Sequence, residues 1–502
     1  MNKREEQHMA DVKTGAQHIE SLKDGRQVFL DGTLVQDVTT HPAFRGAVAS
    51  AANFYDLQAK PENIDWMTFD CGGGRRASRA WEMPRGYDQL VSRRKALSAW
   101  AASSCGFIGR SPDHVASSLI GQVMSLDVFR KHGPARADAL RNYVAEATRN
   151  DWFLTYVIIN PQADKSKSWG EQAEADLSAR IVDEDAEGIT IRGGKMLGTS
   201  AIMANEVLVA SLQPLRPGEE DLAFSCCLPM NAKGLKVLSR KSYEAHAVSG
   251  WDNPLSSRFD ENDAVIWFED VKVPWDRVFV HRDTDMCRAM FHDTWAHTMQ
   301  NYQAQIRLVE KLRFLTGLAR RVCETIGTVN MPPVRDALGK LAAQTAMVEA
   351  MLHGMEASGS QQGEFFVPNK HMMYSAQVIT QNLYPEIANT IRELSGGGLI
   401  MLPSSAADYA NPEMARIIRT TQQSPAAGSD EKVKFMKLAW DAVGSEFASR
   451  HLQYEMFYAG ANFVTRAHSF RTYDWARAGG MVDEFMASYD RPEMPPVQWR
   501  AA

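Results

Sequence analysis

Hydrophobic and polar residues alternate with two different periods along the chain, and the change of period divides it into three parts. From about residue 16 to residue 150, apolar residues recur every three to four positions, which is typical of helices with one buried face. Between about 153 and 283 the period shortens to two, which predicts strands. The helical period returns at about 284. We therefore expect a helical domain over 1–152, a β domain over 153–283, and a helical bundle with a tail over 284–502.

The first part contains two clear helical patterns and one hairpin pattern. Tyr87–Ser103 and Val115–Phe129 each carry apolar residues at helical spacing. Gln27–Val35 is predicted to form two short strands, because Asp31-Gly32 is a preferred sequence for the two-residue turn of a hairpin. A strand pair therefore precedes these two helices.

The middle part predicts short strands separated by Gly, Pro and Asp, which favour turns. The predicted strands are Gly188–Lys195, Glu206–Ala210, Leu222–Leu228, and Ala264–Phe268 leading into Val271–Pro274. Many short strands of this kind indicate a sandwich or barrel of antiparallel strands.

The last part predicts several long helices. One has an apolar face running from Ile306 to Leu318, and further helices are expected at Pro333–Ser358, Asn369–Leu394 and Glu431–Phe457. Four long helices with short connections are typical of a helical bundle.

Composition and charge exclude several classes of function. The chain has 502 residues, more than one compact core usually spans, and a net charge of -6. Its Lys and Arg residues are scattered, so neither a nucleic acid nor a membrane surface is an expected partner. Residues 1–13 lack the apolar segment of a secretory signal, and no apolar run approaches the ~18 residues of a membrane span. The six cysteines show no CxxC pairing, which predicts free thiols, no metal site and a cytoplasmic location.

Two glycine-rich segments do not form a known nucleotide motif. Gly72–Gly74 and Gly396–Gly398 match neither the GxGxxG fingerprint nor the phosphate-binding loop. A Rossmann or P-loop enzyme is therefore disfavoured.

The segment Gly109–His114 is the first of three that can carry chemistry. Ser111 and Pro112 are typical of a helix start, which by itself needs no function. A helix start does not account for Arg110, whose guanidinium can reach an anionic or phenolate oxygen. Arg110 is therefore a candidate site residue.

The second segment, Tyr156–Gln162, is an apolar strand that ends in Asn160-Pro161-Gln162. Amide groups fixed on a turn can bind the edge of a flat heteroaromatic ring. A plain strand followed by a turn is the alternative.

The third segment, His297–Arg307, opens the long helix of the last part with unusually many polar side chains. His297, Gln300, Gln303 and Arg307 recur at helical spacings, so several of them share a face. A solvated face is the alternative. Because the same helix continues with an apolar stripe, its polar start is predicted to border a cavity.

At these segments the chain resembles the oxygenase components of the 4-hydroxyphenylacetate 3-monooxygenase and chlorophenol 4-monooxygenase family. The similarity covers nearly the whole chain. It rests on Glu20–Arg26, Asp37–Pro42, Arg110–Asp113, Asn160–Gln162, Gly194–Thr199, Phe268–Trp275, Leu394–Gly398 and Gly444–Phe447.

The resemblance implies an α+β fold of the acyl-CoA dehydrogenase type, with an N-terminal helical domain, a central antiparallel β-barrel and a C-terminal four-helix bundle, assembled as a homotetramer. It also implies reduced FAD, or FMN, supplied as FADH2 or FMNH2 by a separate NAD(P)H:flavin reductase. Such enzymes react the flavin with O2 and hydroxylate a small phenolic substrate through a C4a-hydroperoxyflavin, without a metal.

The resemblance further assigns roles to residues. Arg110 is similar to the arginine that contacts both the flavin and the phenolic oxygen, where it favours the phenolate. His297 or Tyr302 is the candidate that binds or deprotonates the substrate hydroxyl. The remaining implied residues are Asn160, Gln162, Thr199, Ser200, Phe447 and Ala448 for the flavin, and His114, Tyr156 and Gln303 for the substrate.

This chain departs from the family at its predicted substrate pocket. The hydroxyphenylacetate enzymes typically carry Tyr at the position of His114 and His at the position of Tyr156. The chlorophenol enzymes place a catalytic histidine near Asn301 or Gln303, where this chain has amides. The substrate is therefore predicted only as a phenol-like ring.

Three alternatives stay open. A 4-hydroxybutyryl-CoA dehydratase-like flavoenzyme needs clustered cysteines for an iron–sulfur cluster, and Cys105 has no cysteine close in sequence. An acyl-CoA dehydrogenase needs a carboxylate base aimed at an acyl chain. A flavin-binding scaffold without chemistry is the third alternative.

Overall fold

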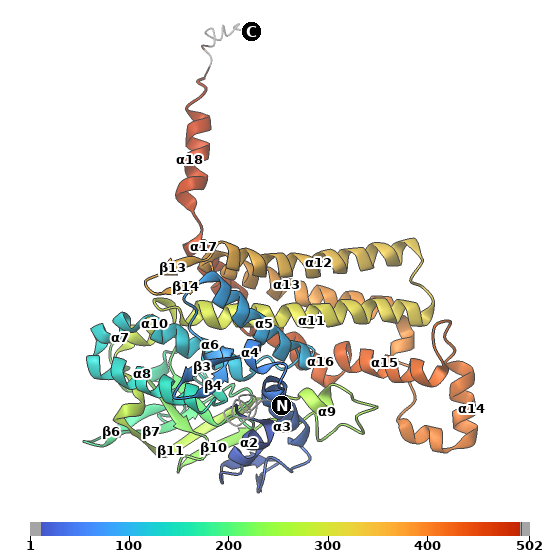
Figure 1. The fold of residues 1–502 in the computed structure, drawn as a ribbon, viewed down its shortest axis with the longest axis horizontal. Coiled ribbons are helices and arrows are strands. Elements are labelled where there is room, and N and C mark those ends of the chain that lie inside the picture. The colour runs from blue at the N-terminus through green and yellow to red at the C-terminus, as the bar shows by residue number, and fades with distance from the viewer. Residues whose placement is uncertain (1–11, 162, 492, 494–502) are drawn as a thin grey trace, which may run out of the picture.

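The computed structural model describes residues 12–161, 163–491 and 493, in which helices, strands and helices follow one another along the chain (Figure 1). The first helices are α2 (Gly15–Ser21), α3 (Arg45–Ala59), α4 (Ile64–Met67), α5 (Tyr87–Ser103), α6 (Pro112–Val123), α7 (Leu126–His132) and α8 (Pro134–Arg149). The predicted range of α5 is confirmed, as is the hairpin of β1 (Gln27–Leu30) and β2 (Thr33–Val35). Asp31 and Gly32 at its turn have φ of 51° and 74°, as this turn requires.

The predicted helix Val115–Phe129 is wrong, because α6 and α7 are separate helices. Ser125 lies between them in a non-helical conformation. Its hydroxyl accepts a hydrogen bond from the backbone N–H of Trp295 at 3.1 Å. The break between α6 and α7 therefore lies against the residue that precedes α11.

Two sheets form the middle of the molecule. The remaining strands are β3 (Thr68–Gly72), β4 (Arg75–Ser78), β5 (Leu154–Val157), β6 (Arg180–Glu184), β7 (Gly188–Lys195), β8 (Glu206–Ala210), β9 (Phe224–Pro229), β10 (Leu235–Ser239), β11 (Ala264–Pro274) and β12 (Val278–His281). The larger sheet has the order β2-β1-β10-β11-β7-β6 and the smaller sheet β12-β9-β8-β5. The short helix α9 (Ser256–Phe259) precedes β11.

The prediction of a closed antiparallel barrel is not confirmed. In the described part of the chain both sheets are open, and a single bridge between Ile159 and Met196 joins them at one corner. Two pairs, β1 with β10 and β5 with β8, are parallel, so the sheets are not purely antiparallel either. Alternating hydrophobicity predicts strands but does not report whether sheet edges meet.

The smaller sheet is buried on both faces. In β8, Val207 and Val209 belong to the core shared by the two sheets, whereas Leu208 and Ala210 belong to the core shared with the helices. The smaller sheet therefore lies between the larger sheet and the helical layer.

A bundle of long helices completes the fold. Its elements are α10 (Thr284–His292), α11 (Ala296–Ile326), α12 (Pro332–Ala357), the hairpin β13 (Ser360–Gln362) and β14 (Phe365–Val367), α13 (Lys370–Ser395), α14 (Pro412–Thr421), α15 (Ser429–Val443), α16 (Glu446–Phe457), α17 (Asn462–Thr472) and α18 (Trp475–Met486). Helices α11, α12 and α13 pack side by side, and α15 with α16 makes the fourth position of the bundle (Figure 1). Among the described residues, no helix is both long and apolar enough to cross a membrane.

The predicted single helix Glu431–Phe457 is wrong, because it is interrupted between α15 and α16. Gly444 packs against the indole of Trp440 with no space for a side chain. The hydroxyl of Ser445 then accepts a hydrogen bond from Ala448 N–H at 3.1 Å and caps α16.

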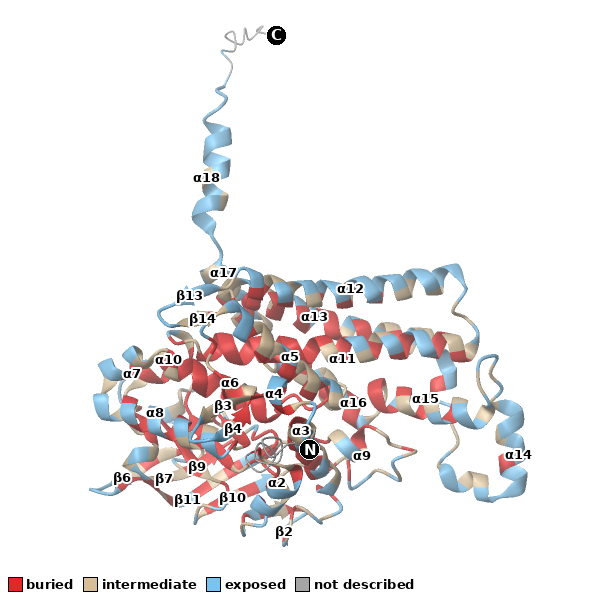
Figure 2. Ribbon diagram, viewed as in Figure 1, coloured by how far each residue is buried: buried red, intermediate tan, exposed pale blue. Residues whose placement is uncertain are grey.

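The first half of α11 runs through the centre of the molecule. Every residue from 296 to 309 is buried, in contrast to α18, none of whose residues is buried (Figure 2). The solvated helix face that the sequence left open for this segment is therefore excluded.

Close contact between α11 and the loop before α6 generates a prediction about stability. Gly106 has φ of 70°, and a side chain there would lie 2.6 Å from Lys311 Cβ. Gly106→Ala is expected to lower the free energy of unfolding by about 1–3 kcal/mol. The matched control is Gly317→Ala on α11, which meets nothing within 4 Å and is expected to be neutral or slightly stabilising. Equal thermal unfolding of the two variants would contradict this packing.

Candidate active site at the junction of the three parts

Arg110 lies in the loop before α6, and its backbone is fixed by a carboxylate. The N–H groups of Gly109 and Arg110 donate to Glu261 Oε2 at 2.7 and 2.9 Å. Gly109 has no room for a side chain, because the ring of Tyr454 packs against it. These contacts set the direction in which the Arg110 side chain leaves the loop.

The Arg110 guanidinium is buried, with only 7% of the residue exposed, and its partners are neutral. It donates to His114 Nε2 at 2.6 Å and to the carbonyl of Tyr458 at 3.1 Å. Its carbon Cζ lies 5.3 Å from the ring centre of Tyr156 and 5.2 Å from that of Tyr454. Burial lowers the pKa of Arg110, but the two tyrosines and Glu261 outweigh burial and raise it above the ordinary value. Arg110 is therefore a permanent cation.

His114, one turn into α6, is held in one neutral form. Gln303 Nε2 donates to Asp113 Oδ1 at 3.1 Å, which turns Gln303 Oε1 toward His114 Nδ1 at 2.8 Å. Nδ1 therefore carries the proton, and Nε2 accepts from Arg110 and from Gln300 Nε2 at 2.8 Å. The Arg110 nitrogen is farther, 3.2 Å, from Nδ1. Burial, followed by the Arg110 charge, keeps the pKa of His114 well below its usual range.

Tyr156 completes this group from β5. Its ring stacks on His114, with ring centres 5.5 Å apart and an angle of 25° between the planes. Arg110, His114, Tyr156 and Gln303 were each expected at the site and lie together, with Gln300 beside them. We call these five residues the Arg110 cluster.

Two loops next to the cluster carry strained backbone and a second carboxylate. Leu197 and Ser200 have φ of 64° and 66°, and Ser200 N–H lies between the carbonyls of Glu261 and Asn262 at 2.8 and 2.9 Å. Asp263 accepts from Thr199 Oγ1 at 2.7 Å.

Asp263 is also the anchor for two arginines. Arg450 binds both of its oxygens, at 2.6 and 2.9 Å, and Arg240 binds one at 3.0 Å. Although burial acts to raise it, these cations hold the pKa of Asp263 well below the ordinary value. Thr199 is thereby tied to α16.

Asn160 follows β5 and is oriented by a buried lysine. Lys195 Nζ donates to Asn160 Oδ1, to the carbonyl of Ala210 at 2.8 Å and to Ser211 Oγ at 3.0 Å. Burial lowers the pKa of Lys195 to about 7. Among the described residues, Asn160 Nδ2 and Ser200 Oγ are buried without a hydrogen-bond partner. Gln162, also expected here, lies outside the described residues.

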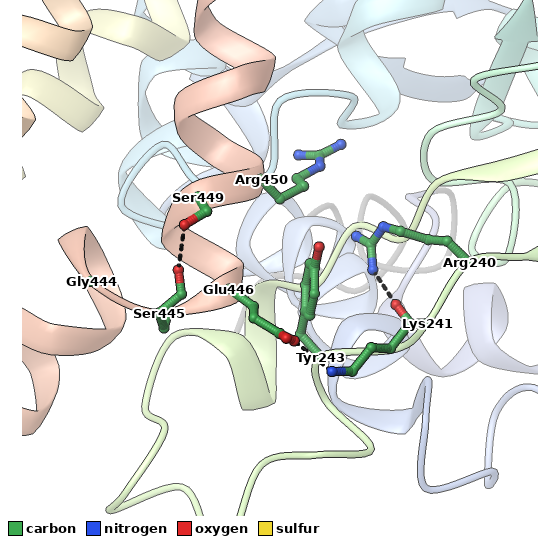
Figure 3. A pocket seen from close by; sticks show the side chains of 8 residues that line it. All are labelled: Arg240, Lys241, Tyr243, Gly444, Ser445, Glu446, Ser449 and Arg450. Atoms are coloured by element: carbon green, nitrogen blue, oxygen red, sulfur yellow. Dashed lines mark hydrogen bonds and ion pairs between the residues drawn. The ribbon is translucent and has the colours of Figure 1, made fainter.

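A cleft of about 430 Å³ opens at the start of α16 (Figure 3). It is lined by Arg240, Lys241, Tyr243, Gly444, Ser445, Glu446, Ser449 and Arg450. Phe447 is instead buried between Phe107 and His451, with ring centres 5.5 and 4.4 Å apart, and Ala448 is also buried. These two residues, which were expected at the flavin, do not line the cleft.

His297 and Tyr302 do not join the Arg110 cluster. His297 Nδ1 lies 3.0 Å from the Tyr374 hydroxyl, in a group of aromatic rings that includes His292 and His468. The hydroxyl of Tyr302 donates to Glu356 on α12. Both side chains leave α11 in other directions than Gln303.

Several polar residues at this junction were missed from the sequence, above all Glu261, Asp263, Arg450 and Tyr454. The acidic run that contains Glu261 and Asp263 is typical of an exposed loop, so nothing in it indicated burial. Arg450 and Tyr454 are four residues apart and share one face of α16, and this spacing is the signal that could have found them.

A separate ion group lies inside the bundle. Glu455 accepts from Arg307 Nη2 and from Lys311 Nζ, both at 2.9 Å, and all three side chains are almost fully buried. Burial acts against the charged carboxylate, but the two cations prevail and lower the pKa of Glu455 to about 2. The described residues contain no group of three or more His, Cys, Asp or Glu side chains that could hold a metal ion.

Comparison with known proteins identifies relatives over the whole length. Residues 14–280 match the sequence family described as "4-hydroxyphenylacetate 3-hydroxylase N terminal", and residues 287–487 match its C-terminal counterpart. The chain is 34% identical to a Rhodococcus protein named "4-nitrophenol 2-monooxygenase, oxygenase component", over 95% of this chain and 92% of that protein.

Two solved structures are similar in fold. The oxygenase component of 4-hydroxyphenylacetate 3-monooxygenase, complexed with FAD and 4-hydroxyphenylacetate, superimposes with a TM-score of 0.90 at 28% identity, over 95% of this chain and 99% of that chain. An archaeal 4-hydroxybutyryl-CoA dehydratase from N. maritimus has a TM-score of 0.86, over 97% of each chain, at 18% identity. The second likeness is one of fold alone. Apart from the closed barrel, the predicted α+β fold is confirmed.

The ion group inside the bundle predicts a pH dependence of stability. Glu455→Gln is expected to lower the free energy of unfolding by about 3–5 kcal/mol at neutral pH, because it leaves two buried cations without their carboxylate. Since the folded state lowers the pKa of Glu455 from 4.5 to about 2, the ion group stabilises the fold above about pH 4.5 and this stability is lost as the pH falls toward 2. The difference in the free energy of unfolding between wild type and Glu455→Gln should therefore shrink as the pH falls from about 4.5 toward 2.

The control for Glu455 is Glu20→Gln, which removes an exposed pair with Lys23 and should leave the free energy of unfolding nearly unchanged. Chemical denaturation at several pH values makes the comparison. A difference between wild type and Glu455→Gln that stays constant down to pH 2 would argue against an ionised Glu455.

Proposed function

The chain belongs to the 4-hydroxyphenylacetate 3-hydroxylase family, and on that premise we propose that it hydroxylates a phenolic ring at the Arg110 cluster. It is a flavin-dependent aromatic monooxygenase and corresponds to the oxygenase component of a two-component system. FAD is its cofactor, as in the structural relative solved with FAD. The observation that carries the assignment to this site is a buried guanidinium whose hydrogen-bond partners are all neutral.

The residues next to the cluster fit a flavin. Asn160 Nδ2, Ser200 Oγ and the Tyr454 hydroxyl are buried without a partner in the described structure, and such groups suit the carbonyl and nitrogen edge of a flavin ring. The cleft of Figure 3 lies at the N-terminus of α16, and a helix N-terminus favours an anionic phosphate; Arg240 and Arg450 in its lining are already paired with carboxylates. When bound, reduced FAD supplies the electrons and the site of O2 activation.

The chemistry of this chain's own residues concerns the substrate oxygen. The Arg110 guanidinium stabilises negative charge on a phenol oxygen, which makes the ring carbons ortho and para to it richer in electrons. His114 Nε2 accepts a hydrogen bond from Arg110 and so orients the guanidinium, and Tyr156 offers a ring face. Because Arg110, His114, Gln300 and Gln303 are buried, water has little access to them, which strengthens these interactions.

We also propose the wider setting. The name of the Rhodococcus relative, an oxygenase component, supports a separate NAD(P)H:flavin reductase as partner. All six cysteines are free thiols, which supports a reducing compartment such as the cytoplasm.

The exposed apolar side chains of α18 support a homotetramer in which this helix is buried against other copies; they include Phe485, Met481 and Met486. The boundaries 152/153 and 283/284 remain our proposed domain limits.

Hydroxylation by the purified chain tests the proposed function. With FAD reduced by any NADH:flavin reductase, O2 and a panel of phenols, at least one phenol should gain one oxygen atom by mass spectrometry. Arg110→Met should reduce the rate by about 100- to 1,000-fold, because the charge on the phenol oxygen loses its stabilising cation.

Arg320→Met is the matched control, since Arg320 is an exposed arginine on α11 and should leave the rate unchanged. If no phenol gains oxygen under these conditions, the proposed function is wrong. If Arg110→Met hydroxylates as fast as Arg320→Met, the chemistry takes place elsewhere.

A further inference from the structure

Arg110 differs from the other arginines at this junction in having no carboxylate partner. Arg450 is paired with Asp263 and Glu261, Arg240 with Asp260 and Asp263, and Arg307 with Glu455. Arg110 makes no ion pair with any described carboxylate, although Glu261 binds its backbone. A buried cation without a counter-ion is costly, and an anion that reaches it is bound tightly.

His114 is poorly suited to produce that anion from a neutral phenol. Its Nδ1–H is committed to Gln303, which Asp113 holds in place, and its Nε2 already faces two donors, Arg110 and Gln300. A proton on Nε2 would remove both hydrogen bonds and place a second positive charge against Arg110. His114 is therefore built as an acceptor that stays neutral.

The other titratable groups around Arg110 and His114 are also unsuited to take a proton. Tyr454 on α16 and Tyr458, which directly follows this helix, are phenols whose pKa is raised, to about 12 for Tyr458, by burial first and by nearby carboxylates. Glu261 is bound by Arg450 and by two backbone N–H groups. Burial raises the pKa of Asp113, but this carboxylate already accepts hydrogen bonds from Ser111 and Gln303, and its side chain reaches His114 only through Gln303. The remaining charged or titratable neighbours are Tyr156 from β5, Arg307 from α11, Arg450 from α16 and Arg93 from α5.

From these contacts we infer that the site takes its phenol as a ready-formed phenolate and favours phenols that electron-withdrawing ring substituents ionise near neutral pH. The inference deepens the proposed function and rests on it. The hydroxyl proton is released to solvent, the phenolate oxygen becomes the counter-ion of Arg110, and Tyr156 and His114 flank it. A phenol without such substituents ionises only at about pH 10 and is a poor substrate at pH 7.

Binding of 4-nitrophenol tests the inference directly, because its phenolate absorbs visible light and the neutral phenol does not. The protein, loaded with reduced FAD under argon, is titrated with 4-nitrophenol at a pH below the pKa of the free phenol, with a pH-indicator dye in weak buffer. We expect the phenolate spectrum on binding and release of about one proton per site to the solution. Arg110→Met should lose the phenolate spectrum, and Arg320→Met should keep it.

Two results of this titration would overturn the inference. A bound neutral phenol would show that Arg110 does not select the anion. A phenolate spectrum without proton release would show that the protein takes up the proton and so contains a base.

A second experiment measures rates, and it can fail for the phenolate inference while the proposed hydroxylation still holds. The rate at limiting substrate is followed against pH for 4-nitrophenol, 4-cyanophenol and 4-methylphenol, which are similar in size. The pH at which each rate levels off should follow the pKa of that phenol, and at pH 7 4-methylphenol should react on the order of 1,000-fold more slowly than 4-nitrophenol. Profiles that level off at one common pH would indicate a protein base and contradict the inference, while the hydroxylated products would still support the proposed function.

Discussion

Glu261, a fully buried carboxylate at the end of the loop before β11, is the contact on which the rest of the site depends. One of its oxygens receives the backbone N–H groups of Gly109 and Arg110, and the other receives Arg450 from α16. A single side chain of the β region thus fixes both helical regions. A buried carboxylate is tolerated only when its hydrogen bonds are complete, so each of these contacts is required to keep the others in place. The direction of the Arg110 side chain follows from this arrangement.

The buried arginines at this junction are of two kinds, those paired with a carboxylate and Arg110, which is not. Arg240, Arg307 and Arg450 each have a carboxylate partner and act as ties between elements. Arg110 stands only among rings, an imidazole and a carbonyl group, and so remains available to a ligand. Tyr454 separates the two kinds, because its ring centre lies 5.2 Å from Arg110, 5.4 Å from Arg307 and 4.8 Å from Arg450. The structural ties and the reactive cation therefore lie close together without sharing a counter-ion.

The local parts of the fold could be predicted from the sequence, because helix faces, strand alternation and the Asp31-Gly32 turn depend on neighbouring residues. The parallel pairing of β1 with β10 and the open edges of the sheets could not, because they depend on contacts between distant segments. The helix break at Gly444 escaped prediction because the apolar pattern continues on both sides of it. At the site, Arg110 and His114 stood out as polar residues at a helix start. Glu261 did not, because an acidic run gives no sign that it will be buried.

We propose that this chain uses reduced FAD to place one atom of O2 on a phenolate held by Arg110. A single turnover with reduced FAD, 4-nitrophenol and isotopically heavy O2, followed by mass spectrometry of the product, tests it most directly. We expect one heavy oxygen atom in the hydroxylated product of the wild-type chain. Product oxygen that comes from water, or oxidation of the flavin without a hydroxylated product for this and every other phenol tried, would contradict it.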